Sequence, residues 1–379
     1  MTDHVIQIES ITLREIHLSL KEPFRISSGV THRRRIFLLE FKTVDSVVEW
    51  SECVAGEEPN YSPETIDTAW LAVRGWVIPR VLGKRIHDPG EIRPMLETDF
   101  RGHNMAKAAV EMGIWGVAAR SAGVSLSKLI GGVRGEIEVG ISLGIQASPQ
   151  LLADKVKSSL DRGYRKVKMK VGPGKDIEFV RIVREAVGPM AHLMVDANNA
   201  YGEKDFKTLQ QLDEFNLMMI EQPLAWDDLV AHARLQKLLN TPLCLDESIT
   251  SVDRARDMIE LKSGGIINIK PGRVGGFASS LAIHDLCAKH GIPVWCGGML
   301  ESGIGRAYNV ALASLPNFIF PGDISPSERY WERDIVIPEW TMSREGKVRV
   351  PTDKPGIGVE VDRDRIENLT VRSEKLRRI

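Results

Sequence analysis

The chain has 379 residues, of which 43% are hydrophobic and 27% are charged. This composition is typical of a folded globular protein and excludes a disordered or fibrous chain. Lys and Arg number 50 and Asp and Glu 51, and the resulting net charge of −1 gives no reason to expect nucleic acid or an anionic membrane as a partner. We therefore expect a small-molecule substrate or ligand.

The location of the protein is indicated by two further features of the sequence. The N-terminal segment has no basic stretch followed by a long apolar one, and no run reaches the ~18 apolar residues of a membrane span. The cysteines Cys53, Cys244, Cys287 and Cys296 are widely spaced and form no CxxC pair, which is typical of reduced thiols in a cytosol. We expect a cytoplasmic protein without a membrane partner.

The first 135 residues predict an α+β capping domain. Apolar and polar residues alternate over 6–8 and 16–20, which indicates two half-buried strands, and further strands are expected at 36–41 and near 48–50. From 62 to 131 apolar residues recur at helical spacing, until Gly131 and Gly132 end the run.

A long loop is expected over residues 22–34, because Pro, Ser and Gly interrupt the pattern there. Long loops on a rigid scaffold often cover ligands, although an irregular connection would have the same composition. The basic run from His32 to Arg35 directly precedes an apolar stretch, and we interpret it as a solvated turn that enters a strand.

Residues 136–330 predict a (β/α) barrel. Short β-rich runs alternate with amphipathic helical stretches, which is typical of a parallel sheet; an open doubly wound sheet has the same periodicity. No glycine-rich phosphate-binding motif follows any run, which disfavours a nucleotide-binding sheet. The polar segment 331–379 is expected to pack back on the capping domain. The eight expected strands lie at 138–145, 166–171, 192–198, 217–223, 242–248, 266–272, 293–299 and 318–324.

Charged residues recur at the ends of consecutive expected strands. They are Lys168 and Lys170, then Asp196, Glu221, Asp246 and Lys270. From Lys170 onward the successive spacings are 26, 25, 25 and 24 residues, which is one βα unit each time. Because the carboxyl ends of barrel strands meet at one mouth, these side chains are expected to converge there.

The three acidic residues predict a metal site. A single acidic residue at a strand end is commonly a helix cap or a solvated charge. Asp196, Glu221 and Asp246, however, each lie within an apolar run, and buried like charges need a compensating cation. Oxygen ligands without Cys or His favour Mg²⁺, Mn²⁺ or another hard divalent cation over zinc. Asn198, two positions after Asp196, faces the same way and is a candidate for supporting a ligand or the substrate.

The lysines predict acid–base chemistry. Lys168 and Lys170 are two positions apart on a strand, so both point to the barrel interior, where a lysine is costly unless it is paired or functional. Beside Lys168 and a metal ion, Lys170 is a candidate general base. Lys270 enters from the other side of the ring. Two lysines that flank one substrate carbon can handle a proton on either face.

These residues resemble the enolase superfamily over essentially the whole chain, through KMK at 168–170, VDAN, IEQP, LDES and IKPGRVGG. The segment GGMLESGIGRAYNVALASLPNFIFPGDIS resembles the o-succinylbenzoate synthase/N-succinylamino acid racemase family. The resemblance implies that Asp196, Glu221 and Asp246 bind the metal. It also implies that Lys170 and Lys270 are the acid–base pair, and that Lys168 supports Lys170 and the substrate carboxylate.

The resemblance further implies substrate contacts by Ser142, Arg273, Gly298, Met299 and Glu301, for which strand-end packing or, for Arg273, a salt bridge is the alternative. Segments 22–34 and 52–62 occupy the specificity region of the family, and the first is more basic than the family pattern. We expect a small-molecule carboxylate substrate and a homo-oligomer. Synthase and racemase both remain open, as do a dipeptide epimerase, a muconate cycloisomerase and a mandelate-racemase-like enzyme. A Schiff-base aldolase would not need three carboxylates, and a binding module is the least favoured alternative.

Overall fold

A twisted antiparallel sheet forms the core of the capping region in the computed structural model, which describes residues 5–27 and 29–378. Its strand order is β16-β1-β2-β3, with a short strand β4 beside the start of β1. The strands are β1 (Ile6–Ile26), β2 (Gly29–Thr43), β3 (Val48–Cys53), β4 (Arg85–Ile86) and β16 (Thr370–Arg377). The separate strands predicted at 6–8 and 16–20 are parts of one strand, because residues 10–15 between them pair with both β2 and β16.

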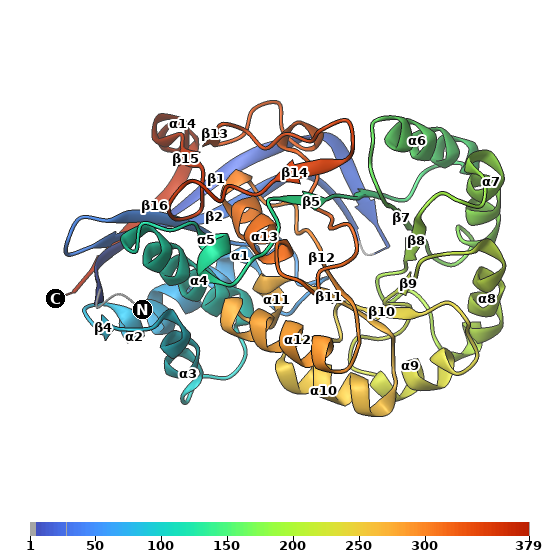
Figure 1. Ribbon diagram of the computed structural model, residues 1–379, viewed down its shortest axis with the longest axis horizontal. Helices are drawn as coiled ribbons and strands as arrows, with labels where there is room; N and C mark the ends of the chain where they lie inside the picture. The colour runs from blue at the N-terminus through green and yellow to red at the C-terminus, as the bar shows by residue number, and fades with distance from the viewer. Residues whose placement is uncertain (1–4, 28, 379) are drawn as a thin grey trace.

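The predicted loop at 22–34 is wrong. β1 continues to Ile26 and β2 begins at Gly29, with Phe24 paired to Thr31 and Arg25 to Val30. The register shifts between Ser19 and Phe24, around Pro23, which has no N–H to donate to the ladder. Proline therefore interrupts the pairing without ending the hairpin. Ser28 lies outside the described residues. In Figure 1 the blue hairpin extends from the capping region toward β7 of the barrel.

The helices of the capping region cover one side of this sheet. They are α1 (Ile66–Ala72), a π-helical turn (Val73–Val77), α2 (Ile78–Val81), α3 (Ile92–Glu97), α4 (Asn104–Ser121) and α5 (Leu126–Leu129). Helix α4 is buried along most of its length because it lies between the sheet and the barrel. Gly113 permits close packing on the sheet, since a Cβ there would lie 2.1 Å from the Phe41 ring. Glu111 of α4 accepts hydrogen bonds of 2.8 Å from the backbone of both Phe277 and Ala278 in the barrel.

Seven parallel strands form the barrel sheet, in the order β6-β7-β8-β9-β10-β11-β12. They are β6 (Ile141–Leu143), β7 (Val167–Lys170), β8 (Leu193–Asp196), β9 (Ile220–Glu221), β10 (Leu243–Leu245), β11 (Ile266–Ile269) and β12 (Val294–Cys296). The expected fold class, an enolase-like modified barrel with an α+β cap, is confirmed by this architecture and by the structural relatives described below.

Two expected barrel strands differ in the structure. The segment 138–145 divides into β5 (Glu136–Glu138) and β6, and β5 pairs with β14 (Lys347–Arg349) of the tail instead of a barrel strand. The segment 318–324 is not a regular strand, because Pro321 and Gly322 interrupt it. It still lies between its expected neighbours: Asp323 N donates to Cys296 O at 2.9 Å and Gly322 N donates to Glu138 O at 3.2 Å. Isolated bridges thus close the barrel.

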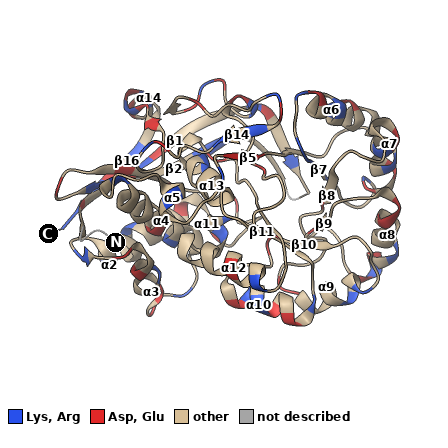
Figure 2. Ribbon diagram, viewed as in Figure 1, with Lys and Arg blue, Asp and Glu red and all other residues tan. Residues whose placement is uncertain are grey.

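Helices surround the barrel on the outside (Figure 1). They are α6 (Pro149–Asp161), α7 (Ile177–Val187), α8 (Phe206–Gln210), α9 (Leu229–Gln236), α10 (Val252–Leu261), α11 (Pro271–Val274), α12 (Phe277–Lys289) and α13 (Gly303–Ala313). The tail holds β13 (Val336–Ile337), β14, β15 (Glu360–Val361), α14 (Arg363–Leu369) and β16, which returns to β1. Charges of both signs are spread over the outer helices (Figure 2). Within residues 5–27 and 29–378, no helix is long and apolar enough to cross a membrane.

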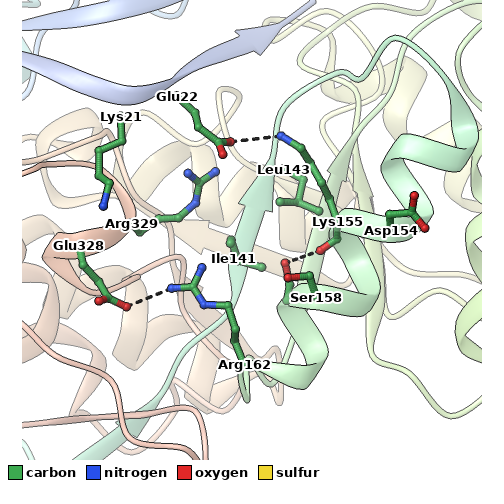
Figure 3. Close-up of a pocket in the computed structure, with 11 residues that line it drawn as sticks. Lys21, Glu22, Ile141, Leu143, Asp154, Lys155, Ser158, Arg162, Glu328 and Arg329 are labelled. Atoms are coloured by element: carbon green, nitrogen blue, oxygen red, sulfur yellow. Dashed lines mark hydrogen bonds and ion pairs between the residues drawn. The ribbon is translucent and has the colours of Figure 1, made fainter.

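The hairpin is tied to the barrel beside a groove of about 470 Å³ (Figure 3). Lys155 of α6 donates to Glu22 of β1 at 3.1 Å, and Arg162, just after α6, contacts Glu328 at 3.0 Å. Ile141 and Leu143 of β6 form its floor. The groove contains none of the predicted site residues; the Lys155–Glu22 ion pair holds the hairpin against α6, and the Arg162–Glu328 pair joins the end of α6 to the segment 327–329.

Candidate active site

The strand ends bring the predicted lysines and carboxylates together. Asp196 ends β8, Glu221 ends β9 and Asp246 follows β10, so the three carboxylates come from the central strands of the sheet. Lys170 ends β7 on one flank, and Lys270 follows β11 on the other. All five side chains are buried. The regular spacing in the sequence therefore corresponds to one charged cluster, with a lysine on each side of the acids.

On the β7 side, Lys168 and Lys170 contact the carboxylates directly. The Lys168 ammonium group lies 3.0 Å from Glu221 Oε2 and 3.2 Å from Asp196 Oδ2. Lys170 donates to Asp196 Oδ2 at 2.5 Å and to Asn198 Oδ1 at 2.6 Å. Burial lowers the pKa of Lys168, but the carboxylates of Asp323, Glu221 and Asp196 outweigh this effect and raise it. Lys168 is thus a fixed positive charge.

On the opposite side, Lys270 and Arg273 contact Asp246. Lys270 donates to Asp246 Oδ2 at 2.8 Å, and Arg273 forms an ion pair with Asp246 Oδ1. Arg273 also donates to the backbone oxygens of Ile249 at 2.7 Å and Asn268 at 2.5 Å, so it is a buried clamp and not a surface salt bridge. The capping region reaches this side through Tyr61, whose hydroxyl lies 2.9 Å from Asp246 Oδ1 and whose ring covers Lys270 Nζ at 4.4 Å.

Burial and neighbouring charges shift the pKa values of the carboxyl groups in opposite directions. Burial raises the pKa of Glu221 to about 7, and the charge of Asp196 adds to the rise. Burial also raises the pKa of Asp196, but Lys170 and Lys168 together lower it below its usual range. Lys168 lowers the pKa of Glu221, but burial and the charges of Asp196 and Asp246 outweigh this effect, so Glu221 is costly to ionise between its two acidic neighbours.

The donor set fits a hard divalent cation. Three carboxylates from adjacent strands offer only oxygen, and another positive charge would relieve the raised pKa of Glu221. Among the described residues, no group of three or more potential ligands converges on one point as the side chains stand. The reason is visible in the contacts: lysine, arginine, tyrosine and asparagine donors take up the carboxylate oxygens. The chemistry of the three carboxylates fits the ion.

Asp323 is a member of the cluster that the sequence analysis did not identify. Its Oδ2 lies 2.8 Å from Lys168 Nζ, and its Oδ1 lies 3.2 Å from Lys166 Nζ. Lys166 is fully buried over the Trp295 ring, 3.5 Å from its centroid. Burial raises the pKa of Asp323, but Lys166 and Lys168 lower it to about 2. A signal was present: Lys166, Lys168 and Lys170 alternate on one strand, and three inward lysines require further carboxylates.

Other residues that the sequence analysis missed position the carboxylates. Gln222 of the IEQP segment accepts from the backbone N–H groups of Asp246 at 3.0 Å and Ser248 at 3.2 Å, which fixes the end of the neighbouring strand. Asn268 donates to Glu221 Oε1 at 2.7 Å. Glu247 accepts from Asn198 at 3.0 Å, and burial and the charge of Asp246 raise its pKa to about 8. Gln222, Glu247 and Asn268 are single polar residues outside any periodic pattern, so no feature of the sequence distinguishes them from other polar residues.

A cavity of about 480 Å³ opens above the cluster, a volume suited to a small ligand. The capping region forms one wall through the β1–β2 hairpin and the segment 56–64, and the barrel forms the other through Lys170, Asn198 and Lys270. The covering role expected for segments 22–34 and 52–62 therefore has a structural basis, although the first is a hairpin.

The remaining predicted substrate residues divide into three groups. Asn198, Gly298 and Met299 line the cavity, and a Cβ on Gly298 would lie 2.6 Å from the Asp323 carbonyl oxygen, so the wall is backbone there. Ser142 pairs with Lys168 across β6 and β7, and its buried hydroxyl has no hydrogen-bond partner among the described residues. Glu301 lies behind the wall, where its Oε1 accepts from Met299 N at 2.7 Å. Substrate contacts by these residues stay predictions.

Comparison with known proteins matches both regions of the chain. Residues 8–131 match the family described as mandelate racemase/muconate lactonizing enzyme, N-terminal domain, and residues 151–365 match the family described as enolase C-terminal domain-like. The chain is 49% identical over 365 residues to an o-succinylbenzoate synthase of Geobacillus kaustophilus, with 96% of each chain covered. It is 43% identical over 365 residues to an N-succinylamino acid racemase of Amycolatopsis, covering 96% of this chain and 98% of that one. A solved enolase-superfamily member from Listeria innocua superimposes with a TM-score of 0.94 at 40% identity, covering 98% of this chain and 99% of that one.

Proposed function

Because the chain belongs to the o-succinylbenzoate synthase/N-succinylamino acid racemase family of the enolase superfamily, we propose that it removes the proton next to the carboxylate of a succinylated acid. The products would be o-succinylbenzoate, from dehydration of a succinyl-cyclohexene carboxylate, or the other enantiomer of an N-succinylamino acid. The observation that carries the proposal is the arrangement of Lys170 and Lys270 on opposite flanks of three carboxylates.

The two lysines are the proposed acid–base pair. A substrate carbon held between the flanks of the cluster presents one face to Lys170 and the other to Lys270. In racemisation one lysine takes the proton from the carbon and the other returns a proton to the opposite face. In dehydration Lys170 takes the proton, Lys270 remains protonated and stabilises the developing negative charge, and the C–O bond to the neighbouring hydroxyl group then breaks, so that the hydroxide leaves as water with the proton that Lys170 returns. The raised pKa of Lys270, which Asp246 causes against the effect of burial, agrees with the latter role.

Asp196, Glu221 and Asp246 are the proposed ligands of Mg²⁺, Mn²⁺ or a similar dication. Such an ion supplies electrostatic stabilisation of the negative charge that moves onto the substrate carboxylate, in the manner of the enolase superfamily, where a lysine base works with Mg²⁺. Lys168 adds a fixed positive charge beside this carboxylate, and Arg273 holds Asp246 in place. Asn198, Met299 and the Gly298 backbone are the proposed contacts of the substrate along the cavity wall.

Proton exchange measures the proposed chemistry before any product is identified. Purified protein is incubated in deuterium oxide with each enantiomer of an N-succinylamino acid, and in parallel with the succinyl-cyclohexene carboxylate in water. We expect deuterium at the α carbon or formation of o-succinylbenzoate, loss of either activity with a chelator, and recovery with Mg²⁺ or Mn²⁺. Absence of both activities in metal-loaded protein would overturn the proposal.

A further inference from the structure

Arg34 is a buried cation on the cavity wall that forms no ion pair within residues 5–27 and 29–378. Its side chain lies on β2 among the residues that line the cavity above Lys170 and Lys270, and it is only 6% exposed. One nitrogen, Nη2, donates long hydrogen bonds of 3.4 Å and 3.3 Å to the carbonyl oxygens of Val54 and Ala55. The Nε–H group is buried and has no partner among the described residues. The interpretation of residues 32–35 as a solvated turn is therefore wrong, because these residues lie within β2 and Arg34 is buried.

Two neighbouring carboxyl groups, those of Glu52 and Glu301, are engaged elsewhere, and Glu57 on the same cavity wall forms no ion pair with Arg34 among the described residues. Glu52 Oε2 accepts from the Ser302 hydroxyl at 2.6 Å and from Gly305 N at 3.1 Å. Glu301 Oε1 accepts from Met299 N and from Asn309 Nδ2 at 2.8 Å. Burial also raises the pKa of Glu52 to about 7, so this group is only partly charged near neutral pH. Neither carboxylate forms an ion pair with Arg34 within the described part of the chain.

The next residue of the strand shows what a paired arginine looks like in this protein. Side chains alternate along a strand, so Arg35 points to the opposite face of β2. Its guanidinium group lies 2.6 Å from Glu15 and 2.8 Å from Asp67, and these contacts raise its pKa. Arg35 is satisfied within the protein. Arg34 is not, although it is the more deeply buried of the two.

A buried guanidinium group without a carboxylate is costly, and its planar fork of N–H donors matches a carboxylate in two parallel hydrogen bonds. The cavity that Arg34 lines is the one that holds the proposed acid–base lysines. A ligand in this cavity with a second carboxylate, away from the reacting carbon, would supply the missing partner.

We infer that Arg34 binds the distal carboxylate of a dicarboxylate substrate, and that it selects a succinyl group over an uncharged acyl group of similar size. This inference rests on the proposed function for the position of the reacting end. It places the distal carboxylate of the substrate against the wall of the cavity that the capping region forms. A succinyl group ends in a free carboxylate. A butyryl group has a methyl group in place of that carboxylate, and so provides no hydrogen-bond acceptor or negative charge for Arg34.

Two ligands and three variants test the assignment. Binding of N-succinylglycine and N-butyrylglycine to the full-length protein is measured by calorimetry, and kcat/KM for α-proton exchange is measured with N-succinyl and N-butyryl derivatives of one amino acid. We expect Arg34→Met to weaken N-succinyl binding and kcat/KM by about 10²-fold, with N-butyryl values within threefold of wild type, as for loss of one charged hydrogen-bonded pair. Arg34→Lys should keep part of the preference, because it keeps the charge and loses the fork. Arg35→Met is the matched control and should keep the full preference.

Three outcomes would overturn the assignment. They are wild-type protein that binds the succinyl ligand no tighter than the butyryl ligand, equal losses for both ligands in Arg34→Met, and the same loss of preference in Arg35→Met. Calorimetry on wild-type protein requires neither turnover nor a folded variant. A succinyl preference in binding without any proton exchange would therefore support the Arg34 subsite and contradict the proposed function, so the two failures can be told apart.

Discussion

At the barrel mouth each of the buried cations Lys168, Lys170, Lys270 and Arg273 contacts a carboxylate, whereas on the capping wall of the same cavity Arg34 contacts none in the part of the chain that the structure describes. The charges of the barrel cluster neutralise one another, because the ends of adjacent strands carry lysines and carboxylates side by side. The capping wall carries a guanidinium group without an ion-pair partner among the described residues. This difference is the basis for our proposal that the barrel strands determine the chemistry and the cap determines which acid is accepted.

The largest expected effects come from neutralising one carboxylate of the barrel cluster. Asp196→Asn, Glu221→Gln and Asp246→Asn should each lower turnover by roughly 10³-fold, because a bound dication provides several kcal/mol of stabilisation in the transition state. Metal affinity, measured by calorimetry, should fall in parallel. Asp253→Asn, an exposed acid on α10 paired with Arg256, is the control and should behave as wild type. Near-normal turnover in any two of the three cluster variants would refute the metal site.

A second expected effect is on stability, at the contact between α4 of the capping region and α12 of the barrel. Glu111 accepts from the N-terminus of α12 and from the Trp115 indole, and burial raises its pKa to about 7 from an ordinary value of 4.5. The folded protein therefore holds this proton up to about pH 7, whereas the unfolded chain releases it above 4.5. Protonated Glu111 therefore contributes to the free energy of unfolding in full below pH 4.5, and this contribution is lost as the pH rises to about 7.

The expected loss is about 3 kcal/mol of unfolding free energy across this interval, at 1.36 kcal/mol per pKa unit. Urea unfolding of wild type and Glu111→Gln at pH 4.5, 6 and 7.5 measures it, because the glutamine cannot titrate. We expect the wild type to lose stability relative to the variant as the pH rises. If the unfolding free energies of the two proteins change with pH in the same way, Glu111 is ionised throughout. The contact between α4 and α12 would then carry a buried charge, as the barrel mouth does.

A smaller effect is expected at Asp323, which contacts Lys168 and would keep contact with it when a metal occupies Glu221 and Asp196. Asp323→Asn should lower kcat by roughly 10- to 100-fold, the usual range for a residue that orients a metal-site group. The substrate KM should change less than kcat. Lys166→Met removes the other partner of Asp323 and leaves Lys168 paired, so most of the turnover should remain. Equal losses of kcat in the two variants would indicate that Asp323 and Lys166 only support packing inside the barrel.

The smallest effect is expected at Tyr61, the contact of the cap with the barrel cluster. Tyr61→Phe removes the hydrogen bond to Asp246 and keeps the ring over Lys270. A single such hydrogen bond contributes about 1 kcal/mol, so kcat/KM should fall roughly fivefold. A loss of more than a hundredfold would show that the capping region takes part in the chemistry, and would remove the distinction between the two regions.

The same two regions differ in how far the sequence predicts them. In the barrel, one charged residue per βα unit predicts the cluster from Lys170 to Lys270, because strand periodicity fixes where each side chain points. Asp323 was missed although it lies in the expected strand 318–324, because a single acidic residue there was not connected with the three lysines of 166–170, and Gln222 was missed because a single amide carries no pattern. These residues act through tertiary contacts.

In the cap, composition was misleading. Pro23 and the serines and glycine after it predicted a loop, but pairing with β2 maintains the strand, and the hairpin buries Arg34 among groups that are distant in sequence. The basic run His32–Arg35 contains one satisfied and one unsatisfied arginine on opposite faces, which composition cannot distinguish. Burial of a charge depends on what packs over it, and here that is the segment after β3.

The central claim is that Lys170 and Lys270 serve opposite faces of one carbon, and solvent deuterium incorporation by single-lysine variants tests it most directly. Lys170→Ala and Lys270→Ala, each first confirmed to bind metal, are incubated in deuterium oxide with the two enantiomers of an N-succinylamino acid. We predict that neither variant racemises, and that each still exchanges the α proton of one enantiomer, with opposite preferences, because the surviving lysine reaches only one face. Equal exchange of both enantiomers by either variant would contradict the two-face arrangement and assign the chemistry to a single mobile base.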